Sequence, residues 1–158
     1  MYTGSEDNNN SDIGRFDSDS IAIRIDNCCS RSLSFDKLVF MEGTLRELET
    51  KTIIKGFGDS ETPINQIGTL RWLIDDDSGV TREIIIPNSY YIPEAGVRLL
   101  SPQHWAQETD EVFNEGTVCF TYGNKIKLLW NNQRYCRTIF INKAGCNTGI
   151  LWTKPSFN

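Results

Sequence analysis

The chain alternates short apolar segments with brief polar turns, and this spacing constrains its fold more than any other feature. Apolar residues recur at every second position or in runs of a few residues, which is typical of β-strands. The turns at 75–79, 123–124 and 131–134 are rich in Asp, Asn and Gly. Many strands joined by short turns indicate an all-β barrel or sandwich. The predicted strands are residues 20–26, 49–57, 64–74, 80–88, 115–123, 125–131, 135–142 and 149–154.

Two segments carry helix signals instead. Residues 35–43 bunch their apolar side chains, and residues 101–110 begin with Ser101 in a position to cap a helix and Pro102 at its first turn. The run Asp75–Asp77 lies between two predicted strands, whereas a calcium-binding EF-hand loop lies between two helices. We therefore interpret it as a hydrated hairpin tip.

Composition excludes several classes of protein. A length of 158 residues suits one domain, and residues 1–18 are so polar that we expect a disordered or linker tail. The net charge of −5 argues against direct nucleic-acid binding, and no apolar run is long enough to span a membrane. The acidic, polar N-terminus is unlike a secretory leader. The five cysteines lack the paired spacing of a zinc site, so we expect reduced thiols, no metal and a cytoplasmic location.

Two groups of side chains allow a second interpretation. The tryptophans suit the core better than a base-stacking platform; they are Trp72, Trp105, Trp130 and Trp152. A local basic cluster suits a solvated face, with contact to RNA or to a neighbouring domain as the alternative. Its members are Lys125, Lys127, Arg134 and Arg137.

Residues 26–30, Asp-Asn-Cys-Cys-Ser, follow the first predicted strand and are the main candidate for a functional site. An aspartate at the end of a strand, followed by small and turn-forming residues, suits a catalytic carboxylate. The same residues suit a turn that merely ends a strand. A nucleophilic Cys28 or Cys29 is a third interpretation, but only His104, distant in sequence, is available as an activating base.

Two later segments extend this pattern. Residues 53–60, IIKGFGDS, form a glycine-rich turn between two strands, and residues 90–101 read YYIPEAGVRLLS. Taken in order with Asp26, they resemble retropepsin-like aspartic proteases, particularly the β-barrel region of copia-type retrotransposon Gag-Pol polyproteins. The resemblance covers roughly residues 20–154 and is most specific at 90–101. It implies an all-β, closed or partly closed barrel with one or two short helices and a C-terminal β extension.

The resemblance also implies a function. Each chain supplies one aspartate, so the enzyme is a homodimeric endopeptidase that cleaves its own polyprotein without a cofactor. The residues implied near the catalytic centre are the carboxylate Asp26, the active-site loop Asn27, Cys28, Cys29 and Ser30, and the supporting Gly96, Leu99 and Leu100. The implied flap, which closes over the substrate, consists of Gly56, Phe57, Gly58 and Asp59. With the polar tail at 1–18, the expected domains are a retropepsin-like core at 19–107 and a C-terminal β extension at 108–158.

The active-site loop departs from the family pattern, in which Asp is followed by Thr or Ser, then Gly and Ala. Asn27 replaces the hydroxyl residue that ties the two loops together, Cys28 replaces the glycine, and Cys29 replaces the alanine. Cys28 adds bulk where glycine leaves room for close approach. The alternative is therefore a degenerate, inactive barrel that serves as a structural or docking module of the polyprotein. A host protein that keeps the barrel for binding is a further alternative.

Overall fold

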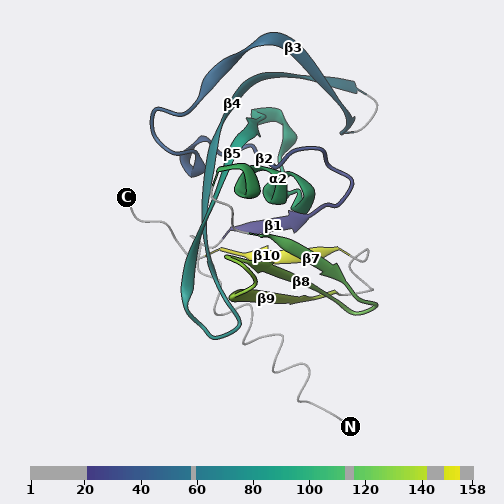
Figure 1. Cartoon of the computed structure of the whole chain (residues 1–158). Coiled ribbons are helices and arrows are strands. Elements are labelled where there is room, and N and C mark those ends of the chain that lie inside the picture. Colours follow the sequence, from purple (N-terminus) through teal and green to yellow (C-terminus); the bar gives the residue numbers. More distant parts are fainter. Residues whose placement is uncertain (1–20, 58–59, 113–115, 142–147, 154–158) are drawn as a thin grey trace.

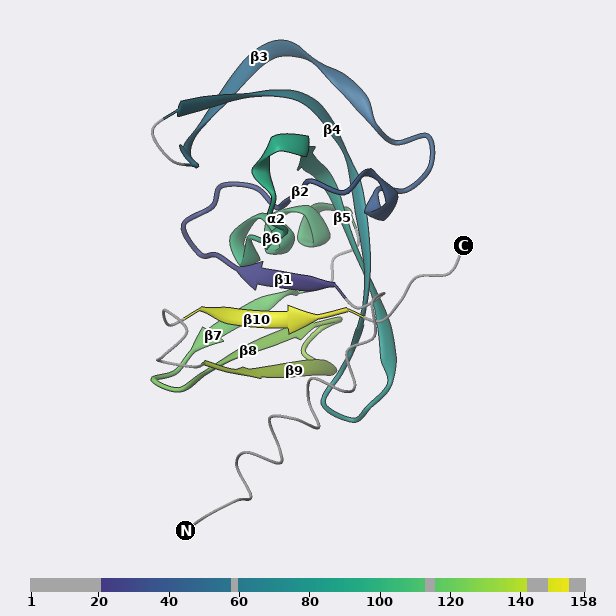
Figure 2. The same cartoon turned by 180° about the vertical axis from the view of Figure 1, so that it is seen from behind.

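Two β-sheets and one α-helix make up the part of the chain that the structure describes (Figures 1 and 2). The structure is a computed structural model, and it describes residues 21–57, 60–112, 116–141 and 148–153, with the backbone alone at 50–57, 60–65 and 110–112. The predicted tail, residues 1–18, lies outside these ranges, as do Gly58 and Asp59 of the predicted flap.

The larger sheet has seven strands in the order β10-β1-β6-β2-β5-β4-β3. Most neighbours run antiparallel, but β6 is parallel to β1 and β2 is parallel to β5. The bounds are β1 Ala22–Ile25, β2 Leu33–Ser34, β3 Arg46–Phe57, β4 Ser60–Asp75, β5 Thr81–Tyr91, β6 Leu99–Leu100 and β10 Gly149–Trp152. The C-terminal strand β10 thus pairs with β1 near the beginning of the described chain.

The smaller sheet has the order β7-β8-β9, with β7 Val118–Thr121, β8 Lys125–Trp130 and β9 Tyr135–Phe140. Figures 1 and 2 show it on the opposite side of β1 and β10 from the long β3–β4 hairpin. The mostly-β prediction is confirmed. The barrel prediction is wrong for the described residues, because β10 and β3 end the seven-strand order and no described strand joins them.

The β4–β5 hairpin shows why these residues form strands. Leu70, Trp72 and Ile74 are buried and alternate with more exposed neighbours along β4. Ile84 and Ile86 do the same on β5. This period of two places every second side chain in the core. A register shift at Gly68 interrupts the pairing, and the isolated bridge between Phe40 and Leu70 lies beside it.

The tip of this hairpin is fixed rather than simply hydrated. The Asp76 carboxylate is buried and accepts hydrogen bonds from Ser78, from the Val80 amide and from Arg82. The hydrogen bond from Ser78 is the main cause that holds the pKa of Asp76 well below its usual range. The Asp77 carboxylate accepts from the backbone N–H and the hydroxyl of Thr138 on β9, so the tip is attached to the smaller sheet.

One of the two predicted helices is present. The helix α2 (Pro102–Val112) begins as predicted, because Ser101 Oγ accepts from the His104 amide at 3.3 Å and caps the first turn. The prediction over 35–43 is wrong beyond the short 3₁₀ helix η1 (Lys37–Val39), whose first turn Asp36 caps. A second 3₁₀ helix, η2 (Pro93–Ala95), precedes β6 and ends at Gly96, where φ is +65°.

The main core lies between the larger sheet, α2 and the inner face of the smaller sheet. Trp105 of α2 packs against Trp130 of β8 with ring centroids 5.5 Å apart. Trp72, Trp105 and Trp130 are buried, as predicted, whereas Trp152 remains partly exposed. A second, smaller cluster of Leu33, Ile92 and Leu99 packs against Cys29 and therefore supports the loop after β1.

Candidate active site

Asp26 follows directly after β1 and is held by main-chain hydrogen bonds. Its N–H donates to the Leu100 carbonyl of β6 at 3.0 Å, and one carboxylate oxygen, Oδ1, accepts from the Cys28 N–H at 2.8 Å. The Cys29 N–H donates to the Asp26 carbonyl at 3.4 Å. The loop backbone thereby fixes the orientation of the carboxylate, which is only half-buried and remains accessible.

The short strand β6 explains how the loop 26–32 is positioned. It lies between β1 and β2, parallel to one and antiparallel to the other, so the chain from Asp26 to Ser32 must pass across its end. Just beyond β6, Ser101 ties both sides of the crossing together. Its N–H donates to Ser32 Oγ at 3.0 Å, and its hydroxyl donates to the Cys29 carbonyl at 2.6 Å.

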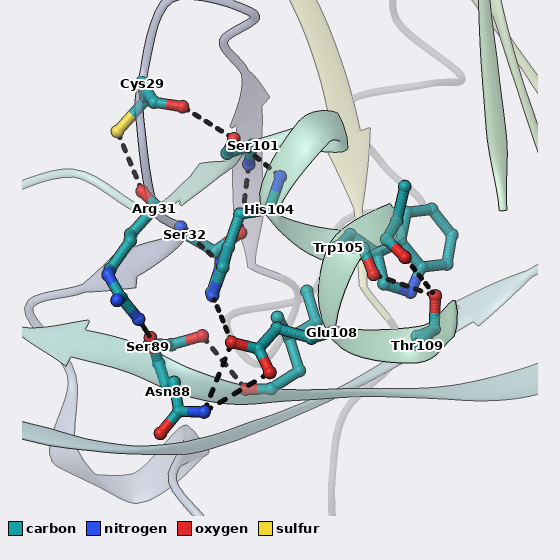
Figure 3. A network of polar contacts seen from close by, with 12 residues as sticks. Cys29, Arg31, Ser32, Asn88, Ser89, Ser101, His104, Trp105, Glu108 and Thr109 are labelled. Carbon is teal, nitrogen blue, oxygen red and sulfur yellow. Dashed lines mark hydrogen bonds and ion pairs between the residues drawn. The ribbon is translucent and has the colours of Figure 1, made fainter. Parts of the chain in front are cut away.

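A buried histidine of α2 forms a hydrogen bond with the same loop (Figure 3). His104 of α2 is almost fully buried, and its Nδ1 accepts from the Ser32 N–H at 3.0 Å. Since Nδ1 is an acceptor, the ring proton of the neutral histidine is on Nε2. Nε2 lies 3.4 Å from Glu108 Oε1, which is close enough for an ion pair. Among the described residues, Nε2 has no hydrogen-bond partner.

The surroundings of His104 favour its neutral form. The pKa of His104 is lower than that of a free histidine, mainly because the ring is buried. The Arg31 guanidinium lowers the pKa further, whereas the Glu108 carboxylate raises it. Arg31 donates to the Asn88 carbonyl at 2.8 Å, and the Asn88 amide donates to the Glu108 carboxylate (Figure 3). The network therefore connects the loop 26–32, α2 and β5.

The two loop cysteines differ in environment. Cys28 is exposed, and its φ is not among the positive values of the described non-glycine residues, so its backbone is in a region that any residue adopts without strain. Cys29 is half-buried and its thiol donates to the Arg31 carbonyl at 2.8 Å. Burial raises the pKa of the Cys29 thiol, and the nearest histidine acceptor is already bound by Ser32. This environment does not favour a nucleophilic cysteine.

The long hairpin of β3 and β4 arches over the loop 26–32. Figures 1 and 2 agree that the free end of this hairpin lies on the same side of the molecule as the loop after β1. Gly56 and Phe57 are the last residues of β3, and Phe57 is in register with Ser60 of β4. The predicted flap residues Gly58 and Asp59 lie outside the described residues.

The remaining predicted site residues fall into two groups. Leu99 and Leu100 are buried and form β6, so their backbone and not their side chains position Asp26. Asn27 and Ser30 are exposed in the loop, and Gly96 is exposed in the turn before β6. Sequence reasoning named Ser101 only as a helix cap and His104 only as a distant base, and it missed the polar network that supports the loop, for which no local motif exists. The network consists of the buried Ser32, Ser101 and His104 and the partly buried Asn88 and Glu108.

Other kinds of site find little support in the described residues. No group of three or more candidate metal ligands occurs among the side chains that the structure describes. Within the same residues, no helix has the length and apolarity needed to cross a membrane. A groove of about 680 Å³ is lined by residues 37–43, Leu45 and Arg71. None of the loop 26–32 contributes to this groove.

Comparisons with protein-family models, curated proteins and solved structures found no significant match to the chain.

Proposed function

We propose that the chain is the protease region of a copia-type retrotransposon polyprotein, a dimeric aspartic endopeptidase that acts in the cytoplasm on its own Gag-Pol. The observation that carries the proposal is the environment of Asp26. Its carboxylate ends a core strand, is oriented by the Cys28 N–H, and lies in a loop over which the β3–β4 hairpin arches. This is the arrangement expected of an acid that works under a flap.

The chemistry requires two copies of the chain, because one carboxylate cannot serve as both acid and base. Two facing Asp26 side chains hold one proton between them, since two like charges a few ångström apart cannot both be ionised cheaply. The ionised carboxylate accepts a proton from a water molecule while the water oxygen attacks the peptide carbonyl carbon. The protonated partner donates its proton to the carbonyl oxygen, which gives a tetrahedral diol.

The diol then collapses to products. A diol hydroxyl returns its proton to the second carboxylate, and the first carboxyl donates the water-derived proton to the peptide nitrogen as the C–N bond breaks. The buried contacts of Ser32, Ser101 and His104 act in the proposal as positioning interactions, because they fix the loop that must meet its copy across the dimer. Asn27, exposed in that loop, is available to bond across the dimer axis.

A second function remains in competition, namely an inactive structural or docking module of the same polyprotein. The specific observation in its favour is the exposed Cys28 side chain beside Asp26, in the place where the family pattern has glycine. The hydrogen bonds of Ser101 and His104 that hold the loop involve neither the Asp26 carboxylate nor the Cys28 side chain. A module that lost activity would keep this support and its fold.

Cleavage of a polyprotein that extends this chain in both directions separates the two functions. The wild-type chain at mildly acidic pH is expected to cleave it, a pepstatin-type inhibitor to slow the reaction, and Asp26→Asn to abolish it. Asp26→Asn keeps an oxygen that can accept from the Cys28 N–H, so the loop is retained. The matched control, Glu94→Gln in the exposed η2, should cleave like wild type. An absence of cleavage at concentrations where the chain dimerises would favour the docking module.

A further inference from the structure

The outer face of the smaller sheet carries exposed aromatic rings interleaved with lysines. We call the five residues concerned the aromatic–lysine face; they are Phe120, Tyr122, Lys125, Lys127 and Phe140. Residues directly opposite each other in a sheet point to the same side. Phe120 is opposite Lys127, and Phe140 is opposite Lys125. The third ring, that of Tyr122, has its centroid 5.2 Å from Lys125 Nζ.

The alternation along β8 shows that this face points away from the core. Ile126, Leu128 and Trp130 are buried on the inner side, so Lys125 and Lys127 belong to the outer side. Phe140 is 71% exposed, Tyr122 46% and Phe120 45%. Three large rings exposed on one face of a sheet are unusual for a surface without a partner and indicate a binding site.

The charge around this face is opposite to that of the whole chain. Residues 116–141 contain four basic residues and no acidic one, although the net charge of the protein is −5. Arg137 is on the inner side and donates to the Asp75 carbonyl, and Arg134 is exposed in the β8–β9 turn. Thr138 is opposite Lys127 and so belongs to the same outer face, where its N–H and hydroxyl bind the carboxylate of one acidic residue, Asp77.

We propose that the aromatic–lysine face binds single-stranded nucleic acid. Flat exposed rings offer stacking surfaces to unpaired bases, and the adjacent lysines neutralise the phosphates that connect them. A protein partner would favour charges at the rim around an apolar centre, whereas here each lysine lies directly beside a ring. The net negative charge of the chain predicts no binding of nucleic acid. Binding at one face, however, depends on the local electrostatic field and not on the total charge.

The test measures binding of a fluorescently labelled single-stranded RNA of about 12 nucleotides, a length within the range of single-strand sites on small domains. Phe140→Ala should weaken binding by about fivefold or more, because stacking on that ring is lost. Replacing both Lys125 and Lys127 by alanine should reduce the slope of log affinity against log salt by about 1.4. An RNA duplex of the same length should bind more weakly than the single strand.

Matched controls lie on η1, where Leu38 is 84% exposed and Lys37 is exposed beside it. Leu38→Ala and Lys37→Ala should leave RNA binding unchanged, as should Asp26→Asn, which affects only cleavage. No binding, equal binding of the duplex, or binding indifferent to Phe140→Ala would each overturn the proposal. Self-association that Phe140→Ala abolishes, without RNA binding, would instead identify a protein interface. Sedimentation and thermal denaturation of each variant exclude loss of fold as the cause.

Discussion

At the scale of single residues, His104 is the titratable residue that holds the loop 26–32 in place. Its Nδ1 is the acceptor for the buried Ser32 N–H. Protonation at Nδ1 would turn this acceptor into a donor that faces another donor. Burial and the Arg31 guanidinium disfavour protonation of the ring, whereas the Glu108 carboxylate favours it.

We expect His104→Leu to destabilise the protein by about 1–3 kcal/mol, the cost of a buried N–H without a partner. His104→Asn, whose side-chain oxygen can take the place of Nδ1, should be milder. The pKa of His104 is lowered in the folded state, so the unfolded chain binds its proton first as the pH falls. The free energy of unfolding should therefore decrease below about pH 6.5. Urea denaturation at several pH values checks this, and an equal decrease in His104→Asn would contradict it.

Cys28 is the exposed neighbour of the proposed catalytic carboxylate, Asp26. It lies exposed beside Asp26 and its backbone does not need the positive φ that glycine permits. We expect Cys28→Gly to raise kcat/KM for polyprotein cleavage by about tenfold, the effect of about 1.4 kcal/mol of relieved steric hindrance. Cys28→Ser, which keeps the bulk, is the matched control. A lower rate in Cys28→Gly would show that the thiol contributes positively to the site.

At the scale of the elements, the base of the long hairpin depends on one close approach. A Cβ at Gly68 of β4 would lie 2.9 Å from Leu45 Cδ2 and 3.2 Å from Leu45 Cα. The register shift of β4 against β5 begins at the same residue. A side chain at this position therefore requires Leu45 to move, close to the point where the β3–β4 hairpin extends past β5.

Gly68→Ala should lower the free energy of unfolding by about 1–3 kcal/mol, as is usual for an overpacked site. Gly123→Ala is the matched control, because a Cβ there meets no atom within 4 Å. It should change stability by no more than about 0.5 kcal/mol. Chemical denaturation measures both, and equal stability of the two variants would show that Leu45 yields without cost.

The elements also show which parts of the fold are predictable from the sequence. The eight predicted strands correspond to β1, β3–β5 and β7–β10, because alternation over several residues is a local signal. The two-residue strands β2 and β6 were missed, since a pair such as Leu99–Leu100 carries no period. Residues 35–43 were predicted as a helix, but burial of Val39 and Phe40 against β4 takes precedence over local propensity.

The candidate site was predictable only in part, for the same reason. The position of Asp26 at the end of a strand follows from the local pattern. Its fixed orientation does not, because it depends on Leu100 and on the buried contacts of Ser32, which lies 69 residues from Ser101 and 72 from His104. Hydrogen bonds between residues so far apart in the chain produce no local sequence pattern from which they could be predicted.

At the scale of the whole molecule, the C-terminal segment completes the sheet that carries Asp26. Strand β10 pairs with β1 over four residues, and Leu151 is buried opposite Ile23. The segment predicted as an extension thus supplies the neighbour of the strand that carries the candidate carboxylate.

We expect Leu151→Ala to destabilise the protein by about 2–5 kcal/mol, as for other buried leucines. Its neighbour on the same strand, Ile150, points outward and is the matched control. Ile150→Ala should cost less than about 1 kcal/mol. Thermal denaturation compares the two, and similar midpoints would mean that β10 contributes little to the stability of the sheet.

The central claim is that two copies of the chain share one catalytic centre built from two Asp26 side chains. Isothermal titration with a statine-type analogue of the tetrahedral intermediate tests it directly, because such analogues bind most tightly where the transition state is stabilised. The account predicts one inhibitor bound per two chains, and no binding to Asp26→Asn. One inhibitor per chain, or equal binding to Asp26→Asn, would contradict it.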